Sequence, residues 1–403
     1  MQNKKDIIYI GNFHFPDGNA AGKRVTANAK LFRNLGYKVT IVDTQQSSGS
    51  SIKLSNEKEE DGFKCYSLPY PKGTSGWLKF RNTFDIVRNL IETREYKHKV
   101  FAVVLYGSPV LSVFNLFLTL YCKKNDIKVI VDCVDWLSVK TKSIFFDTIK
   151  FIDDYMQKVW FNAMADGVIC ISEYLSNYYQ NKGKVTVVVP PLNSKETIDI
   201  YEPLLDDIPT FIYAGRPFRN DMKKDDSSSL KDRIDLVLNI FSDLKSKGYK
   251  FKLNILGFSS EELTQCMPCC SKWINVIASD LTFHGHVSNG TVVNLLKNSH
   301  FSILLRDNKR DSIAGFPTKV AESIYSGIPV LVTDLGDLSK YIENGVHGYL
   351  LPLTDYEAQL NVVENAIKLS KEDILKLKVN CLNSESFNVS SYEDVVSKFI
   401  SKI

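Results

Sequence analysis

The chain has 403 residues, which is enough for two domains of ordinary size that each bury their own core. Hydrophobic residues make up 44% and charged residues 24%, as is typical of a globular protein, and the net charge of +4 is small. This weak positive charge argues against a nucleic-acid-binding protein, which usually concentrates basic residues on one face.

The amino-terminal residues do not resemble a signal peptide, because Met1–Lys5 is polar and the apolar run Ile7–Ile10 is too short. A longer apolar run at 103–122 is interrupted by Gly107 and Pro109. We therefore expect a strand, a turn and a buried helix there rather than a membrane span. The eight cysteines have no paired spacing, which is typical of a reducing cytoplasm.

Three cysteines and two histidines raise the question of a metal site. The segment CMPCC contains Cys266, Cys269 and Cys270, and the segment FHGH adds His284 and His286. A structural zinc site needs about four ligands at turn-like spacing, and the second half of this pattern is irregular. We predict free thiols in a surface loop and no metal site.

The first half of the chain alternates short apolar runs with helical patterns. Strands are expected at 7–11, 37–43, 100–107, 128–135, 166–172 and 184–190. The segment 20–36 has apolar residues at helical spacing and ends at Gly36, so it is predicted to be a helix. Segments 44–64 and 72–80 are polar or contain Gly and Ser, and are predicted to be loops.

The alternation starts again after PPLNSKE (190–196), where two prolines predict a domain boundary. Further strands are expected at 210–215, 251–257, 281–285, 300–305, 328–334 and 348–352. The serine-rich segment 221–229 is predicted to be a mobile loop. The tail 387–403 is predicted to be one amphipathic helix whose apolar side consists of Val389, Tyr392, Val395, Val396, Phe399 and Ile400.

Valine- and isoleucine-rich strands that alternate with helices indicate parallel sheets covered on both faces. The fold predicted from them is α/β, with two Rossmann-like, doubly wound parallel-sheet domains that face a central cleft. We place these domains at 1–192 and 193–386, followed by the helix 387–403. Ligands bind beyond the carboxyl ends of the strands in such sheets, so the cleft is the expected binding site.

The segment GFPTKVAESIY predicts a helix whose amino-terminal end is open to a ligand. Pro317 favours a helix start, and Gly315 lets a ligand approach the backbone closely. The amides of Phe316, Thr318 and Lys319 are then free. Together with the helix dipole they favour an anion such as phosphate.

Glu322 lies one turn further along the same helix. A carboxylate there can accept hydrogen bonds from two hydroxyls, such as those of a ribose. A phosphate at the helix tip and a diol one turn away indicate a sugar nucleotide. The same residues also allow a simpler interpretation, an ordinary capped helix with an exposed ion pair.

Two cations favour the sugar-nucleotide interpretation. Arg216 follows the predicted strand that ends in YAG, and Lys231 opens the helix LKDRIDLVL. The planar fork of an arginine and the point charge of a lysine can clamp a diphosphate from the carboxyl edge of the sheet. Either residue alone is more simply a solvated surface side chain, so the argument depends on both lying at one edge.

The order of AGRP, KDRIDLVL, LNILGF, LTFHGHV and GFPTKVAESIYSGIPVLVTDLGDLSKYIENGVHGYLL resembles the nucleotide-binding domain of family 4 glycosyltransferases, retaining enzymes of the two-Rossmann GT-B fold. The resemblance covers 210–352 well and the amino-terminal half more loosely. It implies that Arg216 and Lys231 hold the donor diphosphate and that Glu322 holds the ribose hydroxyls. It also implies that the amides of 315–318 face the diphosphate and the donor sugar.

One position departs from the family pattern. The family usually has a pair of glutamates, of which Glu322 matches the second, and the first falls at Ala314, which has no carboxylate. Either another group in the predicted loop 306–315, such as Asp311 or Arg306, takes its place, or the enzyme is weakened.

The amino-terminal half contains further candidates. The loop 13–25 resembles the family's first loop, which implies a close approach to the donor at Gly18, a polar contact at Asn19 and an acceptor contact at His14. Arg24 lies one turn into the following helix, where it reaches an anion at the helix tip or is simply solvated.

Two aspartates end a predicted strand in DCVDW. Asp132 and Asp135 could bind acceptor hydroxyls, and Asp135 could instead cap a helix. Ser172 and Glu173, at the end of another strand, are weaker candidates.

The predicted activity is transfer of a sugar from a nucleotide-diphosphate sugar to a hydroxyl of a glycan or lipid-linked acceptor, with retention, in surface polysaccharide synthesis. No cofactor and no nucleic-acid partner are expected, and no metal, because the family does not depend on one and the chain has no DxD triplet. Two alternatives stay open: a sugar-nucleotide epimerase of the same architecture and, because of Ala314, a catalytically silent partner of a glycosyltransferase complex. A dehydrogenase is not supported, since the dinucleotide fingerprint is missing.

The expected location is the cytoplasm, at the inner face of the membrane if the acceptor is lipid-linked. The segment 77–99 mixes aromatic, apolar and basic residues and suits a peripheral membrane contact. A helix packed on its own domain is the simpler interpretation of that segment. By resemblance, the helix 387–403 crosses back to the amino-terminal domain, with a hinge near Pro190 and Pro191.

Overall fold

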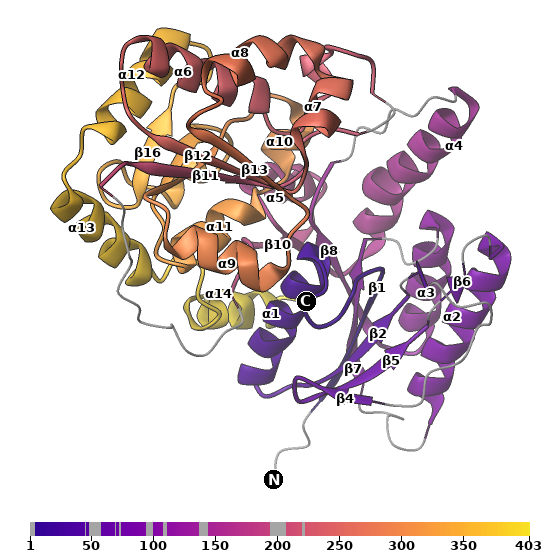
Figure 1. The fold of residues 1–403 in the computed structure, drawn as a ribbon. Helices are drawn as coiled ribbons and strands as arrows, with labels where there is room; N and C mark the ends of the chain where they lie inside the picture. The colour runs from indigo at the N-terminus through magenta and orange to yellow at the C-terminus, as the bar shows by residue number, and fades with distance from the viewer. Residues whose placement is uncertain are drawn as a thin grey trace. The chain divides into compact units, whose positions relative to one another are not determined.

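The chain forms two compact units (Figure 1). The computed structural model describes residues 5–44, 46–47, 58–68, 70–71, 74–93, 100–107, 111–136, 144–193, 207–219 and 222–403. Unit 1 consists of Met1–Ser194, Ala314–Phe316 and Phe387–Ile403. Unit 2 consists of Lys195–Ile313 and Pro317–Ser386.

Unit 1 is built on one large sheet and a small strand pair. The strands are β1 (Asp6–Gly11), β2 (Lys38–Asp43), β3 (Gln46–Ser47), β4 (Lys58–Glu60), β5 (Phe63–Ser67), β6 (Tyr70–Pro71), β7 (Val100–Tyr106), β8 (Lys128–Cys133), β9 (Gly167–Cys170) and β10 (Val185–Val188). The large sheet has the order β10-β9-β8-β7-β1-β2-β5-β4, and only β4 runs antiparallel to its neighbour. β1 is buried along its whole length, because a parallel sheet of this kind is covered on both faces.

The helices of unit 1 cover both faces of this sheet. They are α1 (Ala20–Asn34), α2 (Gly76–Glu92), α3 (Ser112–Lys124), α4 (Ile144–Tyr155), a π-helical segment (Met156–Phe161), a 3₁₀ turn (Asn162–Met164), α5 (Glu173–Gln180), a second 3₁₀ turn (Ser390–Tyr392) and α14 (Glu393–Ile400). α1 lies on one side of the sheet, and α2 and α3 lie on the other (Figure 1). None of the helices in the described ranges is long and apolar enough to cross a bilayer.

The last helix of the chain packs into the core of unit 1. Val396, Phe399 and Ile400 of α14 are buried in the cluster that also contains residues of β1 and β2. A Cβ on Gly167 in β9 would clash with the Phe399 ring, so this glycine allows the helix to approach the sheet closely. α14 is shorter than predicted, and Val395 is 43% exposed instead of lying on the apolar side.

Unit 2 contains a fully parallel sheet. Its strands are β11 (Thr210–Ala214), β12 (Lys252–Leu256), β13 (Leu281–Gly285), β14 (Phe301–Leu304), β15 (Val330–Thr333) and β16 (Gly348–Leu351), in the order β13-β12-β11-β14-β15-β16. The chain builds outward from β11 to β13 and then returns to place β14 on the other side of β11. The topological switch point, where such sheets bind ligands, therefore lies between β11 and β14.

Helices also cover both faces of the second sheet. They are α6 (Ile234–Ser246), α7 (Ser260–Cys266), α8 (Ser271–Val276), α9 (Asn289–Lys297), α10 (Arg310–Ala314), α11 (Thr318–Tyr325), α12 (Tyr356–Ile367) and α13 (Lys371–Leu382), with 3₁₀ turns at Ser227–Ser229, Pro268–Cys270 and Leu338–Lys340. α6, α8 and α12 lie on one side of the sheet, and α9 and α11 lie on the other (Figure 1). The predicted α/β class with two parallel-sheet domains is confirmed.

Three predicted loops contain regular structure. The segment 44–64 includes β4 and the start of β5, where exposed residues Lys58–Glu60 form a polar edge strand. α2 begins inside 72–80, at Gly76 after the capping Ser75, and α10 lies inside 306–315. Edge strands and helix ends are as polar as loops. Polar composition alone therefore predicted loops in these three segments.

The segment predicted to be mobile is tied to its neighbours over its described residues, 222–229. The Asp225 amide donates to the Cys266 carbonyl, and the Asp225 carboxylate accepts from the Cys269 amide. Cys266 and Cys270 are buried rather than on a surface loop, and all three thiols of this region are free. The prediction of free thiols is confirmed, and the prediction of a surface loop is wrong.

Candidate functional site

Charged side chains gather at the switch point of unit 2. Tyr213 lies near the carboxyl end of β11, Arg306 follows β14, and Asp232 precedes α6. The three residues come from segments far apart in the sequence, and the parallel sheet brings them to one edge. This is the edge at which an open α/β sheet is expected to bind a ligand.

Asp232 is the centre of this cluster and is only 1% exposed. Its Oδ1 accepts from Arg306 Nε at 2.7 Å, and its Oδ2 accepts from Lys319 Nζ at 2.6 Å and from the Tyr213 hydroxyl at 2.9 Å. Burial alone would raise the pKa of Asp232, but the Lys319 and Arg306 cations outweigh it and hold this pKa well below its usual range. Asp232 is therefore an ionised anchor for two cations.

Lys319 is the exposed member of the cluster. It is the second residue of α11, its side chain is 28% exposed, and its ammonium lies 4.8 Å from the centre of the Tyr213 ring. Gly215 has a φ of 140°, and a Cβ built on it would overlap this ammonium. Because Gly215 has no side chain, the Lys319 ammonium can lie directly against the backbone at the end of β11.

Lys231 adds a second exposed cation. Its side chain is exposed, and its amide donates to the Pro217 carbonyl at 2.8 Å. Burial lowers the pKa of Lys319, Asp232 opposes this, and the nearby charges of Arg306 and Lys231 lower it further. Two cations thus bond one carboxylate and a third lies near them, and the surplus positive charge is on the two lysines that reach solvent.

The start of α11 adds backbone donors to this surplus charge. Pro317 is the N-cap residue and provides no side-chain cap for the helix. Amides in the first turn of a helix have no partner within the helix, and the positive end of the dipole lies there. Thr318 and Lys319 supply these amides beside the Lys319 ammonium. The combination is suited to binding an anion such as a phosphate.

Arg216 points to a different part of the same edge. Its Nη1 lies 2.6 Å from Glu262 Oε1 and 3.5 Å from His286 Nε2, and its guanidinium lies over the Phe218 ring. Glu262 also forms the capping box of α7 with Ser259. The hydrogen bond from Arg216 is the main reason why the pKa of Glu262 lies below its usual value. Solvent-exposed ion pairs of this kind are weak, so an anionic ligand can replace Glu262.

Glu322 lies one helical turn after Lys319 on α11 and is half-buried. Lys319 links the parts of the predicted site. Its ammonium lies against Gly215, which directly precedes Arg216, and it is on the same helix as Glu322. Gly315 and Phe316 belong by their contacts to unit 1. Their predicted ligand contacts stay predictions.

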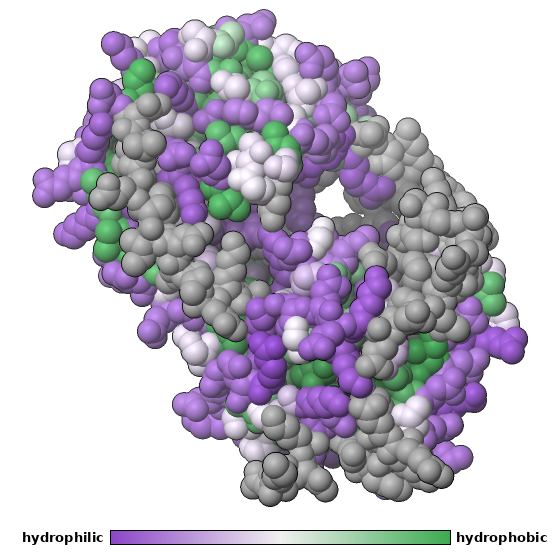
Figure 2. Space-filling model, turned by 60° about the horizontal axis from the view of Figure 1, so that its bottom comes forward, coloured by the Kyte–Doolittle hydropathy of each residue, from purple (hydrophilic) through white to green (hydrophobic). Residues whose placement is uncertain are grey.

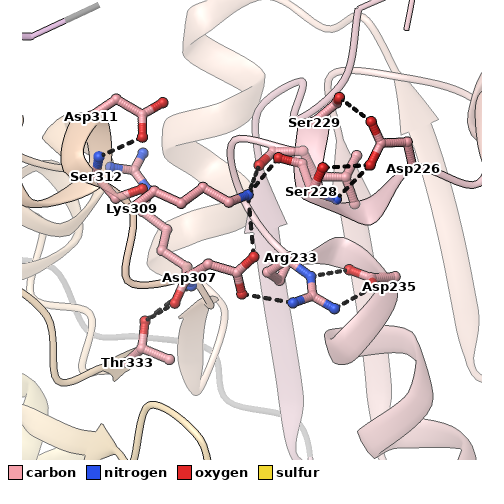
Figure 3. A network of polar contacts seen from close by, with 12 residues as sticks. Asp226, Ser228, Ser229, Arg233, Asp235, Asp307, Lys309, Asp311, Ser312 and Thr333 are labelled. Atoms are coloured by element: carbon pink, nitrogen blue, oxygen red, sulfur yellow. Dashed lines mark hydrogen bonds and ion pairs between the residues drawn. The ribbon is translucent and has the colours of Figure 1, made fainter. Parts of the chain in front are cut away.

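A polar network holds the segment after β14 in place (Figure 3). The Arg233 guanidinium bonds both carboxylate oxygens of Asp235 and also Asp307. Lys309 donates to the Ser228 carbonyl at 2.7 Å. The Arg306 amide and carbonyl both bond the Thr333 hydroxyl, so the backbone that carries Arg306 is fixed to β15 as well as to α6.

Two residues were predicted to replace the glutamate missing at Ala314. The Asp311 carboxylate accepts from the Ser312 amide at the start of α10. Arg306 is 8% exposed and bound to Asp232. Arg306 therefore contributes to the cationic cluster of unit 2, and Asp311 has a local structural contact.

Sequence reasoning missed Asp232, Tyr213 and the side chain of Lys319. Asp232 stands next to Lys231 at the start of a helical pattern, where a carboxylate usually caps the helix or is solvated. Tyr213 lies in a strand that is apolar on both sides. Only the pairing of β11 with β14 brings these residues together, and that pairing is not visible in the sequence.

In unit 1 the prediction that Asp132 binds an acceptor is wrong. Asp132 is 0% exposed, and its oxygens bond Arg24, Tyr9 and Asn28. Arg24 is 4% exposed, and it also donates to the carbonyls of Val189 and Pro190, so it is neither solvated nor an anion site. A buried carboxylate requires a buried cation, and α1 supplies it.

The first loop of unit 1 is held by its own residues. Asn19 is the N-cap of α1, and its Oδ1 accepts from the Gly22 amide at 2.7 Å, so this oxygen is used locally. His14 and Gly18 are exposed. The ligand contacts predicted for His14, for Gly18 and for the side-chain nitrogen of Asn19 stay predictions.

Two further candidates follow strands of unit 1. Asp135 is 40% exposed and lies 3.6 Å from Lys158 Nζ, and its role as an acceptor contact stays a prediction. Ser172 caps α5 and donates to the Ala314 carbonyl at 2.6 Å, so its contacts are structural. Within the described ranges, no group of three His, Cys, Asp or Glu side chains is arranged to hold a metal ion.

The arrangement in unit 2 defines a class of site: a parallel-sheet domain that presents lysines and helix amides to an anion at its switch point. The sequence agrees with this class. Residues 228–378 match the family described as "Glycosyl transferases group 1". This part of the chain is therefore similar to group 1 glycosyl transferases.

Solved structures share the fold over nearly the whole chain. Sucrose-phosphate synthase from Thermosynechococcus elongatus is 13% identical with a TM-score of 0.67, and 99% of each chain is covered. HepE from Anabaena in complex with UDP and glucose is 12% identical with a TM-score of 0.62, covering 99% of this chain and 100% of that one. The lipopolysaccharide outer core galactosyltransferase WaaB is 14% identical with a TM-score of 0.61, covering 98% of this chain and 99% of that one.

A comparison with curated protein sequences gives no match. The structural similarity at this low identity shows the fold alone, which is the predicted GT-B fold.

Proposed function

We propose that this protein is a retaining glycosyltransferase that moves a sugar from a nucleotide-diphosphate sugar to a hydroxyl of a glycan or lipid-linked acceptor. One observation carries the proposal: Lys319, fixed by the buried Asp232, and Lys231, whose charge lies close to it, hold surplus positive charge at the switch point of unit 2. The family match over 228–378 and the similarity to HepE, which was solved with UDP and glucose, support it.

The donor would lie with its diphosphate against the two lysines and the first amides of α11. Arg216 would exchange Glu262 for a phosphate oxygen, since both side chains of this pair are partly exposed. The carboxylate of Glu322, one turn along α11, would accept hydrogen bonds from the ribose hydroxyls. These assignments place unit 2, with predicted limits 193–386, as the donor domain.

The reaction breaks the bond between the anomeric carbon and the diphosphate oxygen, and the electron pair stays on that oxygen. The acceptor oxygen bonds the anomeric carbon on the face that the diphosphate leaves, and its proton passes to a phosphate oxygen. Negative charge grows on the departing diphosphate, and fixed cations and amides stabilise it most in the transition state. This chemistry needs no carboxylate at Ala314.

Unit 1, with predicted limits 1–192, would bind the acceptor. His14, Gly18 and Asp135 are exposed and keep their proposed acceptor and donor contacts, whereas Asp132 does not. We assign the reaction to the cytoplasmic side of the cell membrane and to surface polysaccharide synthesis. The hinge near Pro190 and the helix α14 would connect the two domains during closure.

The proposal is tested by Lys231→Ala and Arg216→Ala in a transfer assay with sugar nucleotides and glycan acceptors. Each change should lower turnover about 10²–10³-fold, which is the usual effect of removing one contact to developing charge. Unfolding curves should stay unchanged, because both side chains are partly or fully exposed. Near-normal turnover of both variants would refute the diphosphate clamp.

Two controls separate the alternative functions. An epimerase would convert the donor sugar without any acceptor, so the donor is incubated alone. Ala314 favours a silent partner in a complex, and such a protein would bind nucleoside diphosphates but transfer no sugar to any acceptor tested. The glycosyltransferase proposal requires transfer, and requires that the donor stays unconverted without an acceptor.

A further inference from the structure

α3 of unit 1 is apolar on two opposite sides. Phe114, Leu118 and Cys122 are completely buried against the unit. Phe117 and Leu120 lie on the other side of the helix and are 51% and 50% exposed. A helix that is apolar all round is normally buried all round, so the outer side of α3 lacks the cover that its composition predicts. The sequence-based expectation of a buried helix at this position is only half correct.

The neighbouring helices extend this uncovered surface. Trp77 at the start of α2 is 72% exposed, and Phe151 and Ile152 on α4 are 63% and 50% exposed. Phe80 of α2 stacks on Trp77 and meets the Phe117 ring edge-on, so α2 and α3 form one surface. Trp160, in the π-helical segment that packs on α3, is 57% exposed.

We call this surface the apolar face and define it by Trp77, Phe117, Leu120, Phe151, Ile152 and Trp160. Figure 2 shows hydrophobic residues at several places on the face in view, which is normal for a globular protein. A concentration is not normal: ten of the fifteen large apolar side chains exposed in the described ranges lie between Trp77 and Trp160. A concentration of exposed apolar side chains of this kind is typical of an interaction site.

The charges on these helices indicate what binds there. Each described acidic side chain has a partner: Asp85 has Arg81 and Arg88, Glu92 has Tyr121, Asp153 has Ser112, and Asp154 has Lys158. Three lysines on the same helices have no ion-pair partner among the described residues: Lys123 and Lys124 at the end of α3, and Lys150 on α4. Among the described side chains of α2, α3, α4 and the π-helical segment, seven are basic and four are acidic, so the net charge of these side chains around the apolar face is positive.

We propose that the apolar face docks the protein onto the anionic surface of a lipid bilayer. Apolar and aromatic side chains enter the boundary between headgroups and acyl chains, where tryptophan is favoured, and the three lysines contact lipid phosphates. The protein lies on the bilayer and does not cross it. The inference rests on the proposed function in one respect, since docking would bring the acceptor-binding unit to a lipid-linked acceptor.

A second copy of this chain fits the apolar face less well. A two-fold contact would place the same patch on both sides of the interface. Lys123, Lys124 and Lys150 of one copy would then share the interface with the same lysines of the other, and like charges repel. Lipid phosphates neutralise these charges, so the bilayer is the occupant that the charges favour.

The test is sedimentation of the purified full-length chain with vesicles, without any sugar nucleotide. Vesicles of phosphatidylcholine alone are compared with vesicles that contain phosphatidylglycerol in equal part. Binding to the anionic vesicles should be about tenfold or more tighter, since each lysine near such a surface adds attraction, and it should weaken as salt is raised. Equal or absent binding to both vesicle types would overturn the proposal.

Variants locate the contact. Phe117→Ser combined with Leu120→Ser should abolish binding, and changing the three lysines to glutamine should remove the preference for anionic vesicles. Leu375→Ser combined with Val379→Ser on α13 is the matched control, because these side chains are 41% and 52% exposed outside the apolar face. The control should bind like the unchanged protein, and an equal loss in control and test variants would overturn the proposal.

Two further measurements distinguish bilayer docking from dimer formation and from a failure of the proposed function. Light scattering should show a monomer at the protein concentration used, and a dimer that Phe117→Ser with Leu120→Ser dissociates would overturn the bilayer in favour of a second copy. Nucleoside diphosphate binding at unit 2 should be the same in all these variants. Loss of vesicle binding with intact nucleotide binding would thus support docking whether or not sugar transfer is found.

Discussion

Each unit contains a buried aspartate bound to an arginine and a tyrosine, and the two clusters differ in what they leave exposed. In unit 1 Asp132 binds Arg24, which is 4% exposed. In unit 2 Asp232 binds Arg306, which is 8% exposed, and also Lys319, which is 28% exposed. The first cluster balances its charges and is closed, and the second has a surplus of cations and is open.

This difference separates a structural role from a binding role. Arg24 also donates to the carbonyls of Val189 and Pro190, so the closed cluster joins α1 and β8 to the end of the first domain. In the open cluster, the buried aspartate holds Lys319 at a place that solvent and a ligand can reach. A buried carboxylate can serve either purpose, and the exposure of its cations distinguishes the two.

The largest effect is expected when the closed cluster is broken. Arg24→Met should lower the free energy of unfolding by about 3–5 kcal/mol at neutral pH, because it leaves Asp132 buried without a cation. Urea unfolding followed by circular dichroism measures this change. Lys38→Met, on an exposed residue at the start of β2, is the control and should change stability little. Equal effects of both changes would show that the Arg24–Asp132 pair does not hold the unit.

Changing Lys319 in the open cluster should affect the stability of the unit little and its affinity for a nucleoside diphosphate more. Lys319→Met leaves Asp232 bonded to Arg306 and Tyr213, so the unit should stay folded. Affinity for a nucleoside diphosphate should fall about tenfold to a hundredfold, as expected for the loss of a hydrogen bond between charged groups. Isothermal titration measures the affinity, and Lys309→Met, whose side chain bonds the Ser228 carbonyl, is the control. An unchanged affinity would exclude Lys319 from the site.

The role of Glu322 is sharpened by changing the ligand as well as the protein. Glu322→Gln should weaken binding of a nucleoside diphosphate about tenfold, because a neutral amide accepts hydroxyl hydrogen bonds less well than a carboxylate. The 2′,3′-dideoxy analogue should bind the unchanged protein with a similar loss. The two losses should not add, and full additivity would mean that Glu322 does not contact the ribose.

The smallest effect is expected for Lys378 on α13, a buried cation that has no carboxylate partner among the described residues. It is 3% exposed, and its ammonium donates to the Lys297 carbonyl at 3.0 Å. Burial lowers the pKa of Lys378 to about 7, below its usual value. The unfolded chain then binds this proton more tightly than the folded chain, so stability should rise as pH increases from about 7 toward 10.

Lys378→Met should remove this rise and stabilise the protein by about 1 kcal/mol or more near neutral pH. Thermal unfolding of the variant and the unchanged protein across this pH range gives the difference. Lys376→Met, on an exposed neighbour, should keep the original pH dependence. Parallel curves for the Lys378 variant and the unchanged protein would show that Lys378 stays charged when buried.

Most of the architecture could be predicted from the sequence, because valine- and isoleucine-rich runs and helical periodicity report burial directly. β1 and β11 fall where these runs predict them. The polar edge strand β4 and the helix α10 were missed, since hydrogen bonding to one neighbour or a single helical turn leaves no periodic pattern.

The candidate site could be predicted only in part. Arg216, Lys231 and the amide of Lys319 stand at helix starts and strand ends, where a pattern exists. Asp132 and Asp232 look alike in the sequence, as carboxylates near the end of a strand or the start of a helix. Both are buried, and whether the cluster around each is closed or open depends on Arg24 and Lys319, which become their neighbours only in the folded chain.

The central claim is that the open cluster of unit 2 binds a diphosphate. It is tested most directly by titrating UDP, GDP and ADP, with the corresponding nucleosides as controls, into the unchanged protein and into Lys231→Ala combined with Lys319→Met. We expect at least one diphosphate to bind much more tightly than its nucleoside, and the double variant to lose that difference. Diphosphates that bind no better than nucleosides, or a difference that survives in the double variant, would contradict the account.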